Sequence, residues 1–191
     1  MRIIAGKYRG RKLVDFQADN IRPTTDRVKE TLFNKLMHVT EGARVLDLFS
    51  GTGNLALECL SREAAWVDLV ESHAKSLGII KENFQLLKVT EGFRIHCLDV
   101  FRYIDGYRKD LYDLVIADPP FTEALAHRLA TVIGASTNLL KPGAVLVIEA
   151  GSKERMDQDY PGLIRLDRRE FGDKHLNFFE KANYDQGDIS R

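Results

Sequence analysis

The chain has few of the residues that build disulfide scaffolds, metal centres or membrane spans. Its 191 residues include two cysteines, one tryptophan and five prolines, and no apolar run approaches the roughly 18 residues of a membrane span. Cys59 and Cys97 each lie in an apolar pattern, so we expect two buried free thiols. No Cys/His spacing indicates a metal site. The N-terminus has no apolar segment long enough for a signal peptide, so the expected location is cytoplasmic.

Net charge is also absent, because 28 Lys and Arg balance 28 Asp and Glu. The distribution is uneven, however. Residues 1–38 carry nine basic against four acidic side chains, whereas residues 39–152 carry 11 against 15. A basic front on a mildly acidic body is typical of a protein that contacts a polyanion through one localised surface. A solvated basic hairpin explains the same charges equally well.

An alternation of apolar runs and amphipathic segments fills the middle of the chain. Strands are predicted at 44–50, 65–71, 93–99, 112–118 and 144–150, and helices at 54–62, 73–88, 100–104 and 122–140. Buried strands separated by helices indicate an α/β fold with a doubly wound, mostly parallel sheet. Segments 162–171 and 174–181 flank a Gly-Asp turn, so the seven-stranded sheet should end in an antiparallel hairpin.

The chain divides into three predicted parts. Residues 1–40 form a small extension, a strand–turn–strand unit with a basic turn followed by a helix that Thr24 or Thr25 caps. Residues 41–182 form the main domain. Residues 183–191 are polar and are expected to be frayed.

The segment DLVIADPPF, residues 113–121, places an unusual group at a strand end. Two prolines follow Asp118, and proline cannot donate to a sheet and keeps the preceding residue out of the helical region. The Asp118 carboxylate and the Pro119 carbonyl can accept both N–H groups of an exocyclic amine and aim its lone pair at an electrophilic methyl. Phe121 offers a face on which a flipped-out base can stack. The alternative is a strand end with a convenient turn.

Three further strand ends carry candidate ligand-binding groups. In DLFSGTGN (47–54), Gly51 and Gly53 with Ala56 match the pattern of a loop that a ligand approaches closely, although a structural turn needs the same glycines. Glu71 lies about 20 residues further on, where a carboxylate accepts both hydroxyls of a ribose or caps a helix. Asp99 could bind an adenine amino group or cap the next helix. Ligands bind at this edge of a parallel sheet.

DLFSGTGN, Glu71 and DPPF together resemble the S-adenosylmethionine-dependent amino-methyltransferases with an [N/D]-P-P-[F/Y/W] motif. More narrowly, RIIAGKYRGRKL, RPTTDRVKETLFN, LALECLSR and FGDKHLNFFEK are similar to the bacterial 16S ribosomal RNA guanine-N2-methyltransferase family that modifies position 966. The similarity runs from about residue 2 to residue 181, and RPTTDRVKETLFN is its most specific segment.

The resemblance implies a Rossmann-like methyltransferase fold, S-adenosyl-L-methionine as the cofactor and 16S rRNA as the partner, without a metal or a membrane. It implies cofactor contacts from Asp47, Phe49, Gly51, Gly53, Glu71 and Asp99, and target-base contacts from Asp118, Pro119 and Phe121. RNA contacts are expected from Arg9, Arg11, Lys12, Arg22, Thr25 and Arg27 in the basic front.

Several readings compete with this one. Many guanine-N2 enzymes have Asn where Asp118 stands and adenine-N6 enzymes commonly have Asp, so an adenine-N6-methyltransferase of DNA or RNA is the nearest rival. The glycine pattern also fits a dinucleotide oxidoreductase, and the basic front fits a non-catalytic RNA-binding module, against which DPPF counts. A chain of 191 residues has little room for a DNA-recognition domain. We therefore expect a pre-shaped substrate, such as rRNA in a partly assembled small subunit.

Overall fold

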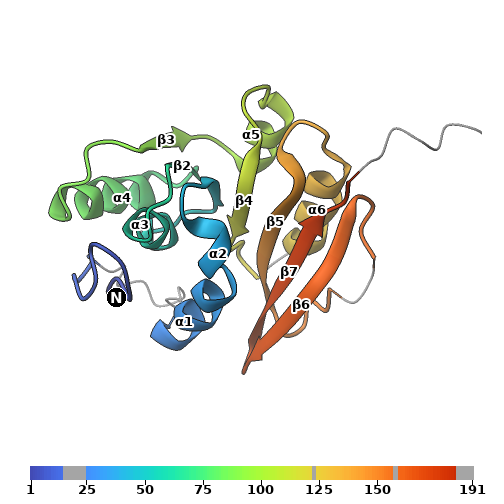
Figure 1. The fold of residues 1–191 in the computed structure, drawn as a ribbon, viewed down its shortest axis with the longest axis horizontal. Helices are drawn as coiled ribbons and strands as arrows, with labels where there is room; N and C mark the ends of the chain where they lie inside the picture. Colours follow the sequence, from blue (N-terminus) through green and yellow to red (C-terminus); the bar gives the residue numbers. More distant parts are fainter. Residues whose placement is uncertain (15–24, 122–123, 157–158, 184–191) are drawn as a thin grey trace, which may run out of the picture.

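The apolar runs form one seven-stranded sheet with helices on both faces (Figure 1). The computed structural model describes residues 1–14, 25–121, 124–156 and 159–183. The elements are α1 (Asp26–Lys35), α2 (Met37–Thr40), β1 (Arg44–Leu48), α3 (Asn54–Ser61), β2 (Trp66–Glu71), α4 (Ala74–Leu86), β3 (Phe93–Cys97), α5 (Val100–Gly106), β4 (Tyr112–Ala117), α6 (Leu125–Ala135), β5 (Leu140–Gly151), β6 (Leu163–Phe171) and β7 (Lys174–Lys181).

The strand order is β3-β2-β1-β4-β5-β7-β6. Strands β1 to β5 pair in parallel, and β7 inserts antiparallel between β5 and β6. This order confirms the predicted doubly wound sheet with a closing antiparallel hairpin. The direction of winding reverses between β1 and β4, so ligands are expected beyond the carboxyl ends of these two neighbouring strands.

Two apolar clusters cover the two faces of the sheet. One cluster contains buried residues of α1, α3 and α4, and the other contains buried residues of α5 and α6. Side chains alternate between faces along each strand: Leu114 and Ile116 of β4 belong to the first cluster and Val115 and Ala117 to the second. We call these the α3 face and the α6 face. Among the described residues, no helix is long and apolar enough to cross a membrane.

The N-terminal segment is docked on α3 by buried polar groups. An antiparallel bridge joins Arg2 to Lys12, and backbone N–H groups of Ile3 and Leu13 donate to the carbonyls of Arg11 and Met1 beside it (both 3.0 Å), so the predicted strand–turn–strand unit is present in short form. The Glu58 carboxylate accepts the backbone N–H groups of Ile4 and Ala5, at 2.9 and 3.1 Å. These bonds replace those that a longer strand pair would make within the segment.

A buried lysine of α1, Lys29, contacts both the N-terminal segment and α3. The Lys29 ammonium is fully buried, donates to the Arg2 carbonyl and to Asn54 Oδ1 (3.0 Å), and lies 3.5 Å from the Glu58 carboxylate. Burial lowers the pKa of Lys29, and the Glu58 charge opposes that shift. Because an unpaired buried charge is costly, Lys29 and Glu58 each depend on the other, which ties the segment, α1 and α3 into one unit.

Two expectations are corrected by the structure. Cys59 is buried as predicted, but Cys97 is exposed because it ends β3, an edge strand that is covered less well. The helix predicted over 122–140 ends at Ala135, where Asn138 N–H donates to Ser136 Oγ (3.3 Å) and side chains of this kind compete with helical bonds. Arg22 and the predicted tail after residue 183 lie outside the described residues.

Two glycines of the N-terminal segment provide a matched test of its docking. Gly6 and Gly10 have φ of +80° and +79°, but a Cβ on Gly6 would lie 1.8 Å from the Ser61 carbonyl oxygen, whereas one on Gly10 would meet nothing within 4 Å. Gly10→Ala should cost about 1–2 kcal/mol, from the left-handed backbone alone. Gly6→Ala should cost about 1–3 kcal/mol more, because the segment must move off α3. Equal losses in urea-unfolding free energy would contradict this docking.

Candidate active site at the carboxyl edge of the sheet

The turn after β1 is tight and leaves open space beside one glycine. Ser50 Oγ donates to the Asp47 carbonyl (2.8 Å), and Gly53 N–H donates to the Ser50 carbonyl (2.7 Å). Both glycines have positive φ, +54° at Gly51 and +74° at Gly53. A Cβ on Gly53 would press on the Phe84 ring of α4 (3.2 Å), whereas one on Gly51 would meet only the Phe49 carbonyl oxygen, at 3.9 Å. Gly53 is therefore needed for packing, and Gly51 borders open space.

Glu71 holds this turn to the end of β2. One carboxylate oxygen accepts Gly51 N–H (2.9 Å) and the other accepts His73 N–H (2.7 Å). A carboxylate has about four acceptor positions, so two bonds leave capacity for further donors. The backbone bonds also fix the orientation of the carboxylate, as a group that must accept two adjacent hydroxyls requires.

Asp47 is buried on the α3 face of β1 and is 1% exposed. The Ala56 backbone N–H favours the charged form of the Asp47 carboxyl, while Oδ2 has no hydrogen-bond partner among the described residues. Burial raises the pKa of Asp47 to about 7, and the nearby Glu71 charge adds to the rise. A buried acceptor without a donor is unusual in a native protein and points to a group that is not part of the chain.

Asp118 lies beyond β4, beside the β1 turn. Its backbone N–H donates to the Leu48 carbonyl (3.3 Å). Pro119 is buried, and Phe121 is 44% exposed and packs on Gly151, where a Cβ would lie 3.1 Å from the ring. The Asp118 charge is close enough to raise the pKa of Glu149 of β5, whose Oε1 accepts from Lys174 Nζ of β7 (2.6 Å).

The sheet register aligns these acids. Leu69, Asp47, Ile116 and Val147 lie at one level across four neighbouring strands, and Glu71, Asp118 and Glu149 follow two residues later on the same face. The structure therefore places Asp47, Glu71 and Asp118 at one edge of the sheet, and their ligand contacts stay predictions. The sequence interpretation missed a further residue at this level, Glu149 of β5, and its partner Lys174 of β7. An acid within the apolar run AVLVIEA was the only sequence signal for Glu149.

Two of the predicted cofactor residues, Asp99 and Phe49, also have roles in the fold itself. Asp99 caps α5, where its Oδ1 accepts Arg102 N–H (3.0 Å), so the helix-cap alternative describes at least part of its role. Phe49 has a left-handed backbone, with φ of +59°, and packs partly against the apolar cluster of the α6 face. Its ring thus belongs in part to the core.

The residues expected to contact RNA lie on the surface of the basic front. Arg9, Arg11, Lys12 and Arg27 are exposed and make no ion pair with another described residue, and Thr25 caps α1 by accepting Val28 N–H (3.4 Å). Arg27 lines a hollow of about 510 Å³ between α1 and the β6–β7 turn. A second hollow, of about 670 Å³, contains Phe121 and Gly151. Asp173 lines both hollows, which places them side by side.

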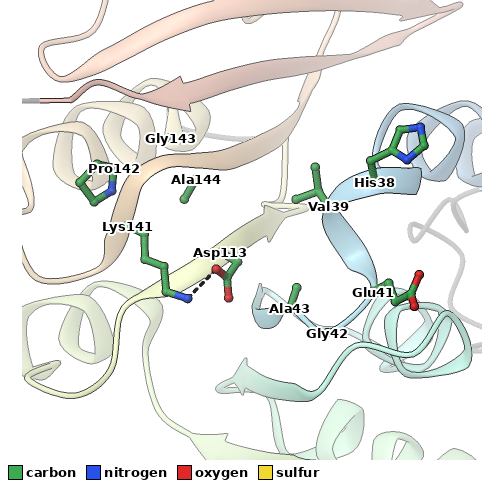
Figure 2. Close-up of a pocket in the computed structure, with 10 residues that line it drawn as sticks. All are labelled: His38, Val39, Glu41, Gly42, Ala43, Asp113, Lys141, Pro142, Gly143 and Ala144. Atoms are coloured by element: carbon green, nitrogen blue, oxygen red, sulfur yellow. Dashed lines mark hydrogen bonds and ion pairs between the residues drawn. The ribbon is translucent and has the colours of Figure 1, made fainter.

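A further hollow, of about 380 Å³, lies at the opposite edge of the sheet (Figure 2). It is lined by the segment before β1 and by the starts of β4 and β5, and an ion pair between Lys141 Nζ and Asp113 Oδ1 (2.6 Å) crosses it. None of the predicted site residues lines this hollow. No cluster of three or more His, Cys, Asp or Glu side chains suited to a metal ion is found in the described ranges.

Comparison with known proteins shows similarity over nearly the whole chain. Residues 1–180 match the family described as Conserved hypothetical protein 95. The chain is 39% identical to "Ribosomal RNA small subunit methyltransferase D" of Haemophilus influenzae, over 78% of each chain. It is also 39% identical to the protein of that name from Escherichia coli K12, over 78% of this chain and 71% of the other. A solved structure described as "Putative methyltransferase yhhF from Escherichia coli" superposes with a TM-score of 0.82 at 30% identity, covering 95% of this chain and 98% of the other.

The raised pKa of Asp47 predicts a pH-dependent stability. Its carboxyl titrates near pH 7 in the folded chain and near 3.9 when unfolded, so the folded chain holds a proton that the unfolded chain releases. The free energy of unfolding should therefore fall as pH rises from about 4 to 7. Asp47→Asn has no such group to titrate. The difference in unfolding free energy between Asp47→Asn and wild type should therefore shift by about 2–4 kcal/mol in favour of the variant as pH rises from 4 to 8. The measurement is urea unfolding without added ligand, with Asp99→Asn as an exposed control; a difference independent of pH would exclude a protonated Asp47.

Proposed function

Since the chain belongs to the family of ribosomal RNA small subunit methyltransferase D, we propose that it transfers a methyl group from S-adenosyl-L-methionine to the exocyclic N2 amine of a guanine in 16S rRNA. The observation that carries the proposal is the place of Asp118. Its carboxylate stands beyond β4, beside the β1 turn at the winding reversal, and Pro119 follows it. This is the position at which a group presented by the substrate meets a ligand held by the turn.

The residues around the β1 turn fit the proposed cofactor. The open space at Gly51 admits a ligand close to the backbone, and the Glu71 carboxylate is held ready to accept ribose hydroxyls. Asp47 Oδ2, on the α3 face of β1, has no hydrogen-bond partner among the described residues and could accept one from the cofactor. When bound there, S-adenosylmethionine would supply an electrophilic methyl group carried on a positively charged sulfur.

Asp118 acts on the amine rather than on the methyl group. The lone pair of a guanine or adenine amine is conjugated with the ring, so the amine is a poor nucleophile. The Asp118 carboxylate and the Pro119 carbonyl accept its two N–H groups and favour a pyramidal nitrogen whose lone pair points away from the ring. Transfer would form the N–C bond and break the bond between the methyl group and the sulfur, which would leave as a neutral thioether. The nitrogen would become positively charged and would then lose one of these protons to Asp118 and on to water.

The basic front and the two hollows mark the proposed RNA surface. Arg9, Arg11 and Lys12 are exposed on the docked N-terminal segment, and Arg27 reaches the hollow that adjoins the one lined by Phe121. Phosphate contacts of this kind set the position of an RNA without reading its sequence. Arg22 belongs to the proposed surface by sequence alone.

The direct test is a methyl-transfer assay with S-adenosylmethionine and either 16S rRNA or small subunits from a strain that lacks this gene. Digestion of the product and mass spectrometry of the nucleosides identify the modified base. N2-methylguanosine supports the proposal. N6-methyladenosine would instead support the rival that Asp118 leaves open, and activity on subunits but not on free RNA would identify the substrate as pre-assembled.

Substitution of Asp118 separates orientation from binding. Asp118→Asn keeps an acceptor oxygen and should retain measurable activity. Asp118→Ala removes the acceptor and should slow the chemical step roughly 10²–10³-fold, the usual cost of losing one preorganised transition-state partner. Single-turnover transfer at saturating substrate isolates this step, and calorimetry should show unchanged cofactor affinity. If Asp118→Ala transfers the methyl group at the wild-type rate, the DPPF segment is only a turn and has no part in the chemical step.

Removal of the basic front should weaken RNA binding and flatten its dependence on salt. A triple Ala variant at Arg9, Arg11 and Lys12 should lower the slope of log K against log salt by about 0.7–0.9 for each phosphate that the protein no longer neutralises. The matched control replaces Arg94, Arg108 and Lys109, three exposed cations that line a separate hollow beside α5. Both variants lose three positive charges, so an equal effect would mean that net charge, and no localised surface, drives binding.

A further inference from the structure

Glu149 is a buried acid in the apolar run 144–150 of β5. Its side chain is on the α3 face of β5, between Val147 and Gly151, and the residue is 5% exposed. The pairing of Ala117 with Ile148 brings the next residues of the two strands, Asp118 and Glu149, together. A carboxyl in this position must find partners, because an isolated buried charge is very costly.

Its partners come from two other elements. Lys174 Nζ, at the start of β7, lies 2.6 Å from Glu149 Oε1, and both side chains are less than a tenth exposed. The Asp118 carboxyl, beyond β4, is close enough for its charge to raise the Glu149 pKa. Two acids at one place beside the Lys174 cation repel each other when both are ionised, which favours a state in which one of them carries a proton. A carboxyl that carries a proton can donate a hydrogen bond to the other.

The electrostatic surroundings decide which group holds the proton. Burial and the Asp118 charge raise the pKa of Glu149 to about 8, against the opposing effect of Lys174. Asp118 is less buried than Glu149. Other charged groups beside Lys174 line the hollow under α1: Arg27, Glu170 and Asp173. The deeper burial of Glu149 favours the proton on Glu149 and the negative charge on Asp118.

We propose that Glu149 is a positioning residue for Asp118: its protonated carboxyl, anchored through Oε1 by Lys174, donates a hydrogen bond that fixes the Asp118 carboxylate with one oxygen turned toward the target amine. The proposal rests on the proposed function of Asp118 and deepens it. Lys174 keeps the acid in place, and Glu149 keeps Asp118 ionised and oriented without adding a second negative charge beside a positively charged cofactor.

A merely structural ion pair between β5 and β7 would contain the same two residues, but it predicts different behaviour. In that case an ionised Glu149 is what the fold needs, and loss of its charge by Glu149→Gln should destabilise the chain at neutral pH. In the proposed arrangement, Gln reproduces the neutral acid: its carbonyl accepts from Lys174 and its amide donates to Asp118. The two roles therefore predict opposite outcomes for one isosteric substitution.

The experiment measures single-turnover methyl transfer from pH 6.5 to 9.5 at saturating cofactor and substrate. Wild-type protein should lose rate above pH 8, about tenfold per unit, as Glu149 loses its proton and repels Asp118. Glu149→Gln should stay within about threefold of wild type at pH 7 and should lack this alkaline decline. Glu149→Ala should be roughly 10–100-fold slower with unchanged cofactor affinity, as expected when one positioning hydrogen bond is removed. Glu170→Gln, an exposed acid beside Lys174, is the matched control and should leave rate and profile unchanged.

Two results would overturn the proposal: a wild-type rate that is flat to pH 9.5, or a Glu149→Gln variant that folds but is as slow at pH 7 as Glu149→Ala. Urea unfolding gives a readout that needs no activity. Because the folded chain retains the Glu149 proton, the midpoint of Glu149→Gln should rise relative to wild type between pH 4.5 and 8. If wild-type protein methylates neither 16S rRNA nor small subunits, the proposed function fails, whereas the unfolding comparison still tests the proton on Glu149.

Discussion

The parallel alignment of β2, β1, β4 and β5 is the constraint on which the rest of the site depends. Parallel strands end at the same edge, and here their register puts Glu71, Asp118 and Glu149 at one level, with Asp47 two residues before that level. Four acids so close together would repel one another if all were ionised. The structure limits this repulsion in three ways: backbone N–H groups bond the Glu71 carboxylate, burial favours the neutral form of Asp47, and Lys174 pairs with Glu149.

The basic front depends on a second set of buried polar contacts, on the far side of α3. Glu58 and Lys29 hold the N-terminal segment and α1 to that helix, and Asn83 of α4 bonds both the N–H (2.7 Å) and the carbonyl (3.2 Å) of Val14. Asn83 also donates to the carbonyl of Thr52 in the β1 turn (3.0 Å). The Asn83 side chain therefore connects the N-terminal segment, which carries the proposed RNA surface, to the β1 turn, where the cofactor is proposed to bind. A shift of that segment would change the hydrogen bonds of the turn.

Much of this arrangement could be predicted from the sequence, because it depends on local signals. Continuous apolar runs identified the strands, and an acid before two prolines placed Asp118 at a strand end. The family resemblance, which the match over residues 1–180 confirms, rested on segments of the same kind. Exposure was harder to predict: an apolar pattern around Cys97 does not reveal that β3 is an edge strand. Glu149 and Lys174 were missed because 25 residues separate them, and only the pairing of β7 with β5 brings them together.

The position of β7 also has a consequence for how the chain is made. Strand β6 precedes β7 in synthesis, but it pairs only with β7, and β5 has no neighbour on that side until β7 arrives. A growing chain that has reached residue 173 therefore exposes an open strand edge and leaves Glu149 without its cation. Strand β7 therefore completes both the sheet and the acid pair. Synthesis of β7 is thus the step at which Glu149 gains its cation and β5 gains its second neighbour.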